Sequence, residues 1–206
     1  WFVKRKLASP GQAASSTEMQ IVTEQMPFGI CQPCKIMKND RNVFYATGEI
    51  SLRMFDALVE FVQRVPNSEH RIDICINSTG GGVIAAFAIA NLLRQLPCKL
   101  RTINVGKVDS AAVVLFLCGG ERIACPNSRF AFHHVGKPID SGAYTYLQLK
   151  EFAKEVHDME MQIVDLLCER TGLDLSFWSE QLKQGAVFTP EQAIKCGLAT
   201  GVNPVD

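Results

Sequence analysis

The sequence has no net charge and lacks several patterns that mark common classes of protein. Its 21 lysine and arginine residues balance 21 aspartate and glutamate residues, so the chain has no excess positive charge for nucleic acid or an anionic membrane. No uninterrupted apolar run reaches the roughly 18 residues of a transmembrane helix. The Gly-x-x-x-x-Gly-Lys-Ser/Thr phosphate-binding motif is also missing. We therefore expect no nucleic-acid partner, no membrane span and no nucleotide site in this chain.

Closely spaced cysteines are scarce as well, although the chain has eight cysteine residues. Only Cys31 and Cys34 form a short pair, with the spacing of half a zinc site or of a redox pair. A zinc site needs further ligands and no second close pair exists. A redox pair normally opens a helix after a strand, whereas this pair lies in a proline-containing stretch. We favour a chance spacing, predict no metal site, and take the scattered thiols as typical of a reducing, cytoplasmic compartment.

Composition and periodicity divide the chain into three segments. Residues 1–20 are small and polar and predict a flexible N-terminal tail. Residues 21–40 form an irregular segment, and residues 41–206 carry regular apolar periodicity and predict one folded domain large enough for its own core. Because the chain starts at Trp1 rather than at methionine, an organellar location after loss of a targeting segment is the alternative to the cytoplasm.

The folded segment alternates apolar strands with amphipathic helices, which predicts an α/β protein with a mostly parallel sheet covered by helices. The expected strands are 43–46, 72–76, 100–105, 122–125 and 129–132, and the expected helices are 52–65, 83–96, 111–118, 144–170 and 173–182, with a last helix starting at Thr189-Pro190. The helix over 144–170 is unusually long, and Gly172 is its expected stop signal.

Two strand-to-helix turns carry candidate chemistry. Gly80 to Gly82 follow the strand 72–76 and open a helix, so their backbone N–H groups can approach a ligand and favour an anion. Ser110 lies between another strand and the apolar run that begins at Ala111. His133 follows a further apolar run and is a candidate base for the serine.

These residues carry a resemblance to the ClpP family, the proteolytic subunits of the ATP-dependent Clp protease. The matching segments are Ser78 to Gly81, Gly106 to Ser110, and Pro126 to His133, in the family's order and with its approximate spacing. The similarity extends from about Asn42 to Leu198. It implies a ClpP/crotonase-like fold for residues 41–206, with repeated β-β-α units, a mostly parallel sheet and a long protruding helix.

The resemblance also implies a reaction, the hydrolysis of peptide bonds in unfolded proteins by a serine-type endopeptidase. Ser110 is then the nucleophile and His133 the base, and the backbone N–H groups of Gly81 and Ala111 form the oxyanion hole. No cofactor is implied in this chain. The family's rings enclose a chamber, so we expect two stacked heptamers joined by the long helix, and an AAA+ unfoldase that uses the ATP.

The family's third catalytic residue has no counterpart here. Counting from the glycine that ends the long helix places that aspartate at Gly185, and loss of the orienting carboxylate can lower turnover by about 10⁴-fold. Three interpretations stay open. Glu180 or Asp174 supplies the carboxylate, a backbone carbonyl or another group orients His133, or the subunit is a non-catalytic member of the ring.

Other features separate these interpretations only in part. Asp109 adds a negative charge beside Ser110, and His134 follows the candidate base where the family has glutamine. A crotonase-like enzyme acting on acyl-CoA thioesters is a further alternative, because the folds are related and share glycine-rich oxyanion turns. It is disfavoured because such enzymes do not need Ser110 and His133 and because no basic patch for the CoA phosphates is evident.

Overall fold

The computed structural model of the protein describes residues 42–66 and 71–202. The predicted tail (1–20) and the irregular segment (21–40), with Cys31 and Cys34, lie outside the described residues, and the expectations for them stay predictions.

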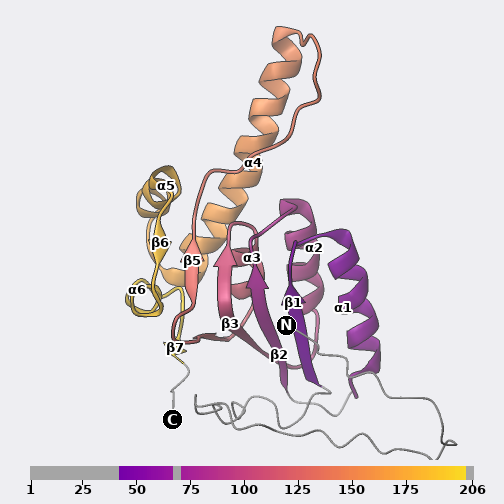
Figure 1. Ribbon diagram of the computed structural model, residues 1–206, viewed down its shortest axis with the longest axis vertical. Helices are drawn as coiled ribbons and strands as arrows, with labels where there is room; N and C mark the ends of the chain where they lie inside the picture. Colours follow the sequence, from indigo (N-terminus) through magenta and orange to yellow (C-terminus); the bar gives the residue numbers. More distant parts are fainter. Residues whose placement is uncertain (1–41, 67–70, 203–206) are drawn as a thin grey trace, which may run out of the picture. The chain divides into compact units, whose positions relative to one another are not determined.

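The domain is built on a seven-stranded sheet in which nearly all neighbours are parallel, as the sequence predicts. The strand order is β1-β2-β3-β4-β7. The C-terminal end of β3 also pairs with β5, and β6 pairs antiparallel with β5 (Figure 1). The strands are β1 (Val43–Thr47), β2 (Arg71–Ser78), β3 (Lys99–Asp109), β4 (Glu121–Ala124), β5 (Arg129–Ala131), β6 (Val187–Phe188) and β7 (Gly201–Val202).

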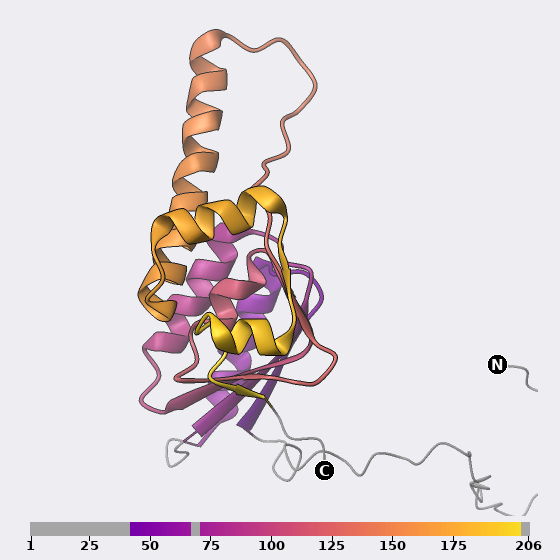
Figure 2. The same ribbon diagram turned by 90° about the vertical axis from the view of Figure 1, so that its left-hand side faces the viewer.

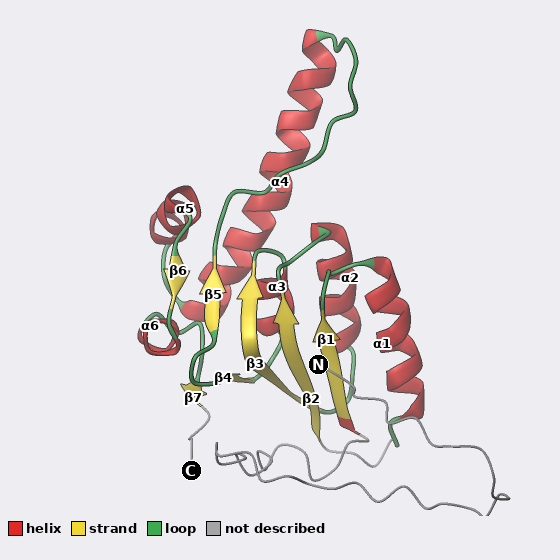
Figure 3. Cartoon of the chain, in the orientation of Figure 1, coloured by secondary structure: helices red, strands yellow, loops and turns green. Residues whose placement is uncertain are grey.

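Local sequence signals set the ends of the helices. The Ser51 hydroxyl accepts the Met54 amide 3.4 Å away and starts α1. Thr145 and Gln148 form a capping box that starts α4, and Gly172 ends α4 in the left-handed conformation at φ 75°. The helices, shown red in Figure 3, are α1 (Leu52–Arg64), α2 (Val83–Arg94), α3 (Ala112–Phe116), α4 (Tyr146–Thr171), α5 (Leu175–Gln184) and α6 (Pro190–Lys195).

Strand β3 is longer than its sequence predicts. The expected strand ends at Val105 before a turn at Gly106, whereas the observed strand continues to Asp109. Gly106 lies inside this strand. The residue there is glycine because a Cβ would lie only 2.8 Å from Oδ1 of the Asn77 side chain. The Gly106 amide bonds the Asn104 side chain at 3.1 Å. The glycine therefore permits a close approach within the strand rather than a chain reversal.

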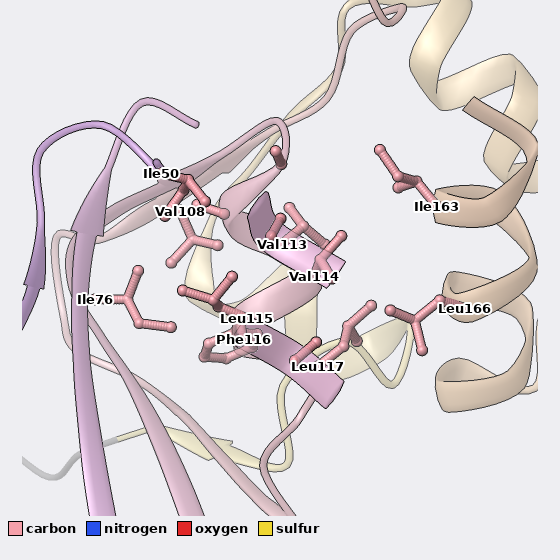
Figure 4. Packing of buried hydrophobic residues seen from close by; sticks show 14 of the residues in the cluster. Ile50, Ile76, Val108, Val113, Val114, Leu115, Phe116, Leu117, Ile163 and Leu166 are labelled. Atoms are coloured by element: carbon pink, nitrogen blue, oxygen red, sulfur yellow. The ribbon is translucent and has the colours of Figure 1, made fainter. Parts of the chain in front are cut away.

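The core is centred on α3, whose five residues are all buried. Figure 4 shows α3 between the sheet, represented by Ile76 and Val108, and the C-terminal half of α4, represented by Ile163 and Leu166. Because the short helix is covered on both sides, its first turn is held in place by packing rather than by helix propensity. This packing fixes the position of the residues immediately before it, including Ser110.

Helix α4 divides into two halves of different environment. Its buried residues all lie in the C-terminal half, at Ile163, Val164, Leu166 and Leu167. The N-terminal half extends beyond the sheet (Figure 1), and there the side chains of Tyr146 and Leu147 are 75% and 66% exposed. Residues 134–145, here called the strap, rise from β5 to this far end of the helix (Figure 2).

The thiol of Cys118 gives the fold a testable pH dependence. Cys118 carries a free thiol, and burial raises its pKa to about 11 despite the nearby positive charges of Arg94 and Arg170. Above about pH 9 the unfolded chain loses this proton while the folded chain keeps it, so the free energy of unfolding falls as the pH rises. The two-unit difference corresponds to at most about 3 kcal/mol.

We expect wild type to lose more stability than Cys118→Ala between about pH 9 and pH 11, over the window that separates the two pKa values. Denaturant unfolding of both proteins across this range measures the difference. Cys98→Ala is the matched control, because burial also raises the pKa of Cys98 but that residue is less buried. An equal pH dependence in wild type and Cys118→Ala would contradict the prediction.

Candidate active site

Ser110 lies on a strained elbow between β3 and α3. Its φ of 55° falls in the left-handed region that residues with a side chain rarely adopt. The elbow is held from both sides, since the Ser110 amide donates to the Ala131 carbonyl of β5 at 2.9 Å and its carbonyl accepts the Val113 amide of α3 at 3.0 Å. The side chain is partly exposed. A non-glycine residue keeps such a conformation only where the surrounding structure enforces it, and residues of this kind cluster at functional sites.

The glycine turn after β2 packs directly beneath this elbow. Gly80 has φ 95°, and a Cβ added to it would lie 2.7 Å from Ser110 Cβ and 3.2 Å from the Ala111 nitrogen. No real side chain tolerates the first of these distances, so only glycine fits at position 80. The absence of a side chain brings the two turns into contact.

Two backbone amides at this contact have no protein acceptor in the described part of the chain. Around Gly81, the Gly80 carbonyl and the Gly82 amide both bond to Ile50, at 2.8 and 2.9 Å, which leaves the intervening Gly81 amide unpaired. The Ala111 amide is also unpaired, although Ala111 is fully buried. Gly81 is an exposed residue, whereas a buried amide without a partner, such as that of Ala111, is rare in proteins. The pair predicted from the sequence as oxyanion donors is therefore available to bind an anion.

His133 lies beyond β5 and lines the same small pocket as Ser110, together with Val113, Phe132 and Ile163. Its Nδ1 lies 2.8 Å from the carbonyl oxygen of His134. A carbonyl can only accept, so this hydrogen bond requires the proton on Nδ1 and leaves Nε2 of the neutral ring free to act as a base. Within the described residues no hydrogen bond joins His133 to the Ser110 hydroxyl. Such contacts are often long in unliganded enzymes.

Neither of the two candidate carboxylates contacts His133. Asp174 caps α5 by accepting the Phe177 amide at 2.8 Å and the Ser176 hydroxyl at 2.9 Å. These hydrogen bonds, the amide of Phe177 first, lower the pKa of the exposed Asp174 carboxyl. Glu180 accepts a hydrogen bond from Gln184 at 2.7 Å on the outer surface of α5. The structure thus does not bring Asp174 or Glu180 to the candidate base.

Gly185 lies beside the strand that leads to His133. It ends α5 in the left-handed conformation, with φ 62° and ψ 43°, and the next residue, Ala186, accepts the Phe132 amide at 2.9 Å. A Cβ added at Gly185 would lie 3.9 Å from the Phe132 carbonyl oxygen, an ordinary contact distance. The position that the sequence identifies for the missing aspartate therefore lies beside Phe132, the residue before the candidate base, and a Cβ there would meet no close neighbour.

A different carboxylate, not singled out by the sequence, does reach this region. Glu160 of α4 lies 2.9 Å from Nδ1 of His134 and accepts the Val135 amide at 2.9 Å. Its signal in the sequence is weak, because it is one of many acidic residues on a long helix and its partners lie 25 and 26 residues earlier in the chain. Asp109 is turned towards β5, where Arg129 pairs with it at 3.3 Å.

Other kinds of site are not formed by the described residues. No three histidine, cysteine or acidic side chains among them gather closely enough to hold a metal ion. No helix of the described ranges combines the length and the apolar character that a membrane crossing requires.

Comparison with known proteins identifies relatives over most of the chain. The model of the Clp protease family matches residues 30–205. The ATP-dependent Clp protease proteolytic subunit of Deinococcus radiodurans is 31% identical over 163 residues, which span 77% of this chain and 78% of the relative. Proteolytic subunit 2 of Streptomyces avermitilis is 33% identical over 141 residues, or 66% and 68% of the two chains.

The fold is likewise similar to that of a solved structure. A point mutant of ClpP1 from Listeria monocytogenes superposes with a TM-score of 0.69 at 22% sequence identity, covering 79% of this chain and 91% of that one. This likeness supports the arrangement of the sheet and of the long helix.

Proposed function

The chain belongs to the Clp protease family, and on that premise we propose that it is a serine-type endopeptidase subunit that hydrolyses peptide bonds through an acyl-enzyme on Ser110. The observation that carries the proposal is the strained Ser110 elbow beside two unpaired amides, with His133 in the same pocket. A packing or turn serine would need neither the unpaired amides nor the histidine.

The proposed reaction assigns each of these groups one task. Nε2 of His133 takes the hydroxyl proton as Ser110 Oγ attacks the scissile carbonyl, and the amides of Gly81 and Ala111 donate to the resulting oxyanion. The imidazolium then gives its proton to the leaving amine, and the acyl-enzyme forms. Water deprotonated by His133 attacks the acyl-enzyme, and the proton returns to Ser110. Each oxyanion donor contributes about 2.7–4 kcal/mol in enzymes of this kind.

Orientation of His133 by a backbone carbonyl is the interpretation of the missing aspartate that we propose. The carbonyl of His134 holds the proton on Nδ1, which is the tautomer that leaves Nε2 free for the serine. A neutral carbonyl stabilises the imidazolium less than an aspartate does, so we expect slower turnover than in a complete triad. The alternative, a non-catalytic ring subunit, is favoured by Gly185.

Assembly into two stacked heptameric rings is also part of the proposal. The exposed apolar side chains at the far end of α4 and on the strap support it, because such a patch is normally covered in an oligomer. They are Ile139, Tyr146, Leu147 and Leu149. We propose unfolded polypeptides as substrates and an AAA+ unfoldase as the partner that consumes ATP, with no cofactor in this chain and a cytoplasmic location.

The proposed function is tested by hydrolysis. The full chain, shown to be assembled by analytical ultracentrifugation, is incubated with an unfolded protein and with fluorogenic peptides, before and after treatment with a fluorophosphonate. The proposal predicts peptide cleavage that the reagent abolishes. An assembled protein that cleaves neither substrate would favour the non-catalytic subunit, and binding of coenzyme A in calorimetry would favour the acyl-CoA alternative.

A further inference from the structure

We propose that Glu160 is the positioning residue that compensates for the missing aspartate, acting on His133 through the peptide group between His134 and Val135. The inference rests on the proposed function and extends it to a residue on another element of the fold. It assigns to a helix carboxylate the electrostatic part of the task that an aspartate at position 185 would perform.

Two hydrogen bonds meet at the peptide group between His134 and Val135, and a third contact reaches the same Glu160 carboxylate. The His134 carbonyl accepts from Nδ1 of His133 at 2.8 Å. The amide of Val135, the other end of the same peptide group, donates to Oε2 of Glu160 at 2.9 Å. The imidazole of His134 adds a second contact to that carboxylate, with Nδ1 2.9 Å from Oε2. The two ends of this peptide group therefore have different partners. Its amide binds Glu160 and its carbonyl binds His133.

A charge at the amide end changes how the carbonyl end behaves. An ionised acceptor makes a stronger hydrogen bond than a neutral one and polarises the peptide group. The carbonyl oxygen then carries more negative charge and becomes a better acceptor for the His133 Nδ1 proton. This effect grows as His133 becomes an imidazolium, which is the state that must be stabilised during the attack of Ser110.

The surroundings of Glu160 favour this role. Its side chain is only 19% exposed, so its charge is less screened by water than that of an exposed carboxylate. It lies one turn before Ile163, which is buried against the core and lines the pocket of Ser110 and His133. A packed helix thus fixes the carboxylate relative to the site.

The charged neighbours of Glu160 are few and identifiable. Lys137 of the strap and His157 of α4 line the same groove as His134 and Glu160. Lys137 pairs with Glu155, one turn earlier on α4, at 2.5 Å. Glu155 also fastens the strap to α4 but has no contact with the peptide between His134 and Val135. It therefore serves as a matched control for a purely structural role.

The test compares Glu160→Gln with Glu155→Gln in the full-length assembled protein. Glutamine keeps the size of the side chain and an oxygen that can accept the Val135 amide, but it removes the charge. We expect Glu160→Gln to lower kcat for a fluorogenic peptide about tenfold to hundredfold, the range found when the carboxylate partner of a metal-bound histidine is removed, with little change in KM. Glu155→Gln should leave both constants unchanged.

Two further readouts separate positioning from structure. Loss of the negative charge should make the protonated form of the catalytic base less favourable, so the acid limb of the kcat/KM profile should move to lower pH in Glu160→Gln alone. In a Gly185→Asp background, where a direct carboxylate can orient His133, the same substitution should have much less effect. A structural role predicts the same loss in both backgrounds and an acid limb that does not move.

The outcomes distinguish this inference from the proposed function. An active wild type with an unchanged rate in Glu160→Gln overturns the role of Glu160 and leaves the proposed function intact. An equal loss with and without Gly185→Asp also overturns it. If wild type and Gly185→Asp are both inactive although assembled, the proposed function fails and the role of Glu160 fails with it.

Discussion

Replacing Gly185 by aspartate is expected to accelerate peptide hydrolysis by as much as about 10⁴-fold, the factor by which loss of the orienting aspartate slows a serine peptidase. The side chain has room, since its Cβ would lie 3.9 Å from the Phe132 carbonyl oxygen. The backbone there has φ 62°, a conformation that aspartate tolerates better than most residues. Because Gly185 lies beside Phe132, the residue before His133, we expect a carboxylate at this position to reach the imidazolium and stabilise it directly. Steady-state kinetics with a fluorogenic peptide measures the gain.

Gly185→Asn is the control for this gain, because asparagine has the same shape and the same tolerance of the left-handed conformation but no charge. We expect Gly185→Asn to be no faster than wild type. An equal gain in both variants would assign the effect to local rigidity rather than to charge. A correctly folded and assembled Gly185→Asp protein with an unchanged rate would contradict the assignment of position 185 to the missing aspartate.

Replacing Gly81 by alanine is expected to lower kcat by at least about 10²- to 10³-fold, the cost of one lost oxyanion donor. Gly81 has φ 148°, and a Cβ there would lie 2.4 Å from the Ile50 carbonyl oxygen and 2.8 Å from the Ile50 nitrogen. These are backbone atoms that cannot rotate away. The segment must therefore shift, and the shift displaces the Gly81 amide from the oxyanion.

Gly48→Ala separates this effect from the general cost of removing a glycine with positive φ. Gly48 has φ 84°, and a Cβ there would have no neighbour within 4 Å. We expect Gly48→Ala to lower the free energy of unfolding but to retain kcat, whereas Gly81→Ala should lose kcat even below its melting temperature. Equal rates in Gly81→Ala and wild type would exclude the Gly81 amide from the reaction.

The parts of the fold that the sequence predicts well are those with local signals. Ser51 before an apolar periodic segment and Gly172 after another mark helix ends that the structure reproduces. The length of β3 is not predictable in this way. Gly106 is a turn signal along the sequence, but in the fold it is the place where a neighbouring strand brings the Asn77 side chain close.

The candidate site is predictable to the same extent. The order of the motifs points to Gly81, Ser110 and His133. In the structure the glycine turn packs against Ser110, and Ser110 and His133 line one pocket. The contact of Glu160 with the peptide after His133 depends on how α4 crosses the strap. No local pattern records that crossing. A departure from a family motif, here Gly185, shows what is missing but not what replaces it.

The most direct test of the account is whether Ser110 is an activated nucleophile. Wild type and Ser110→Ala, both shown beforehand to be assembled, are treated with a fluorophosphonate. Mass spectrometry of the intact proteins detects the adduct, and peptide mapping locates it. The account predicts one adduct on wild type, at Ser110, and none on Ser110→Ala. An assembled wild-type protein that gains no adduct, or an adduct that persists in Ser110→Ala, would contradict it.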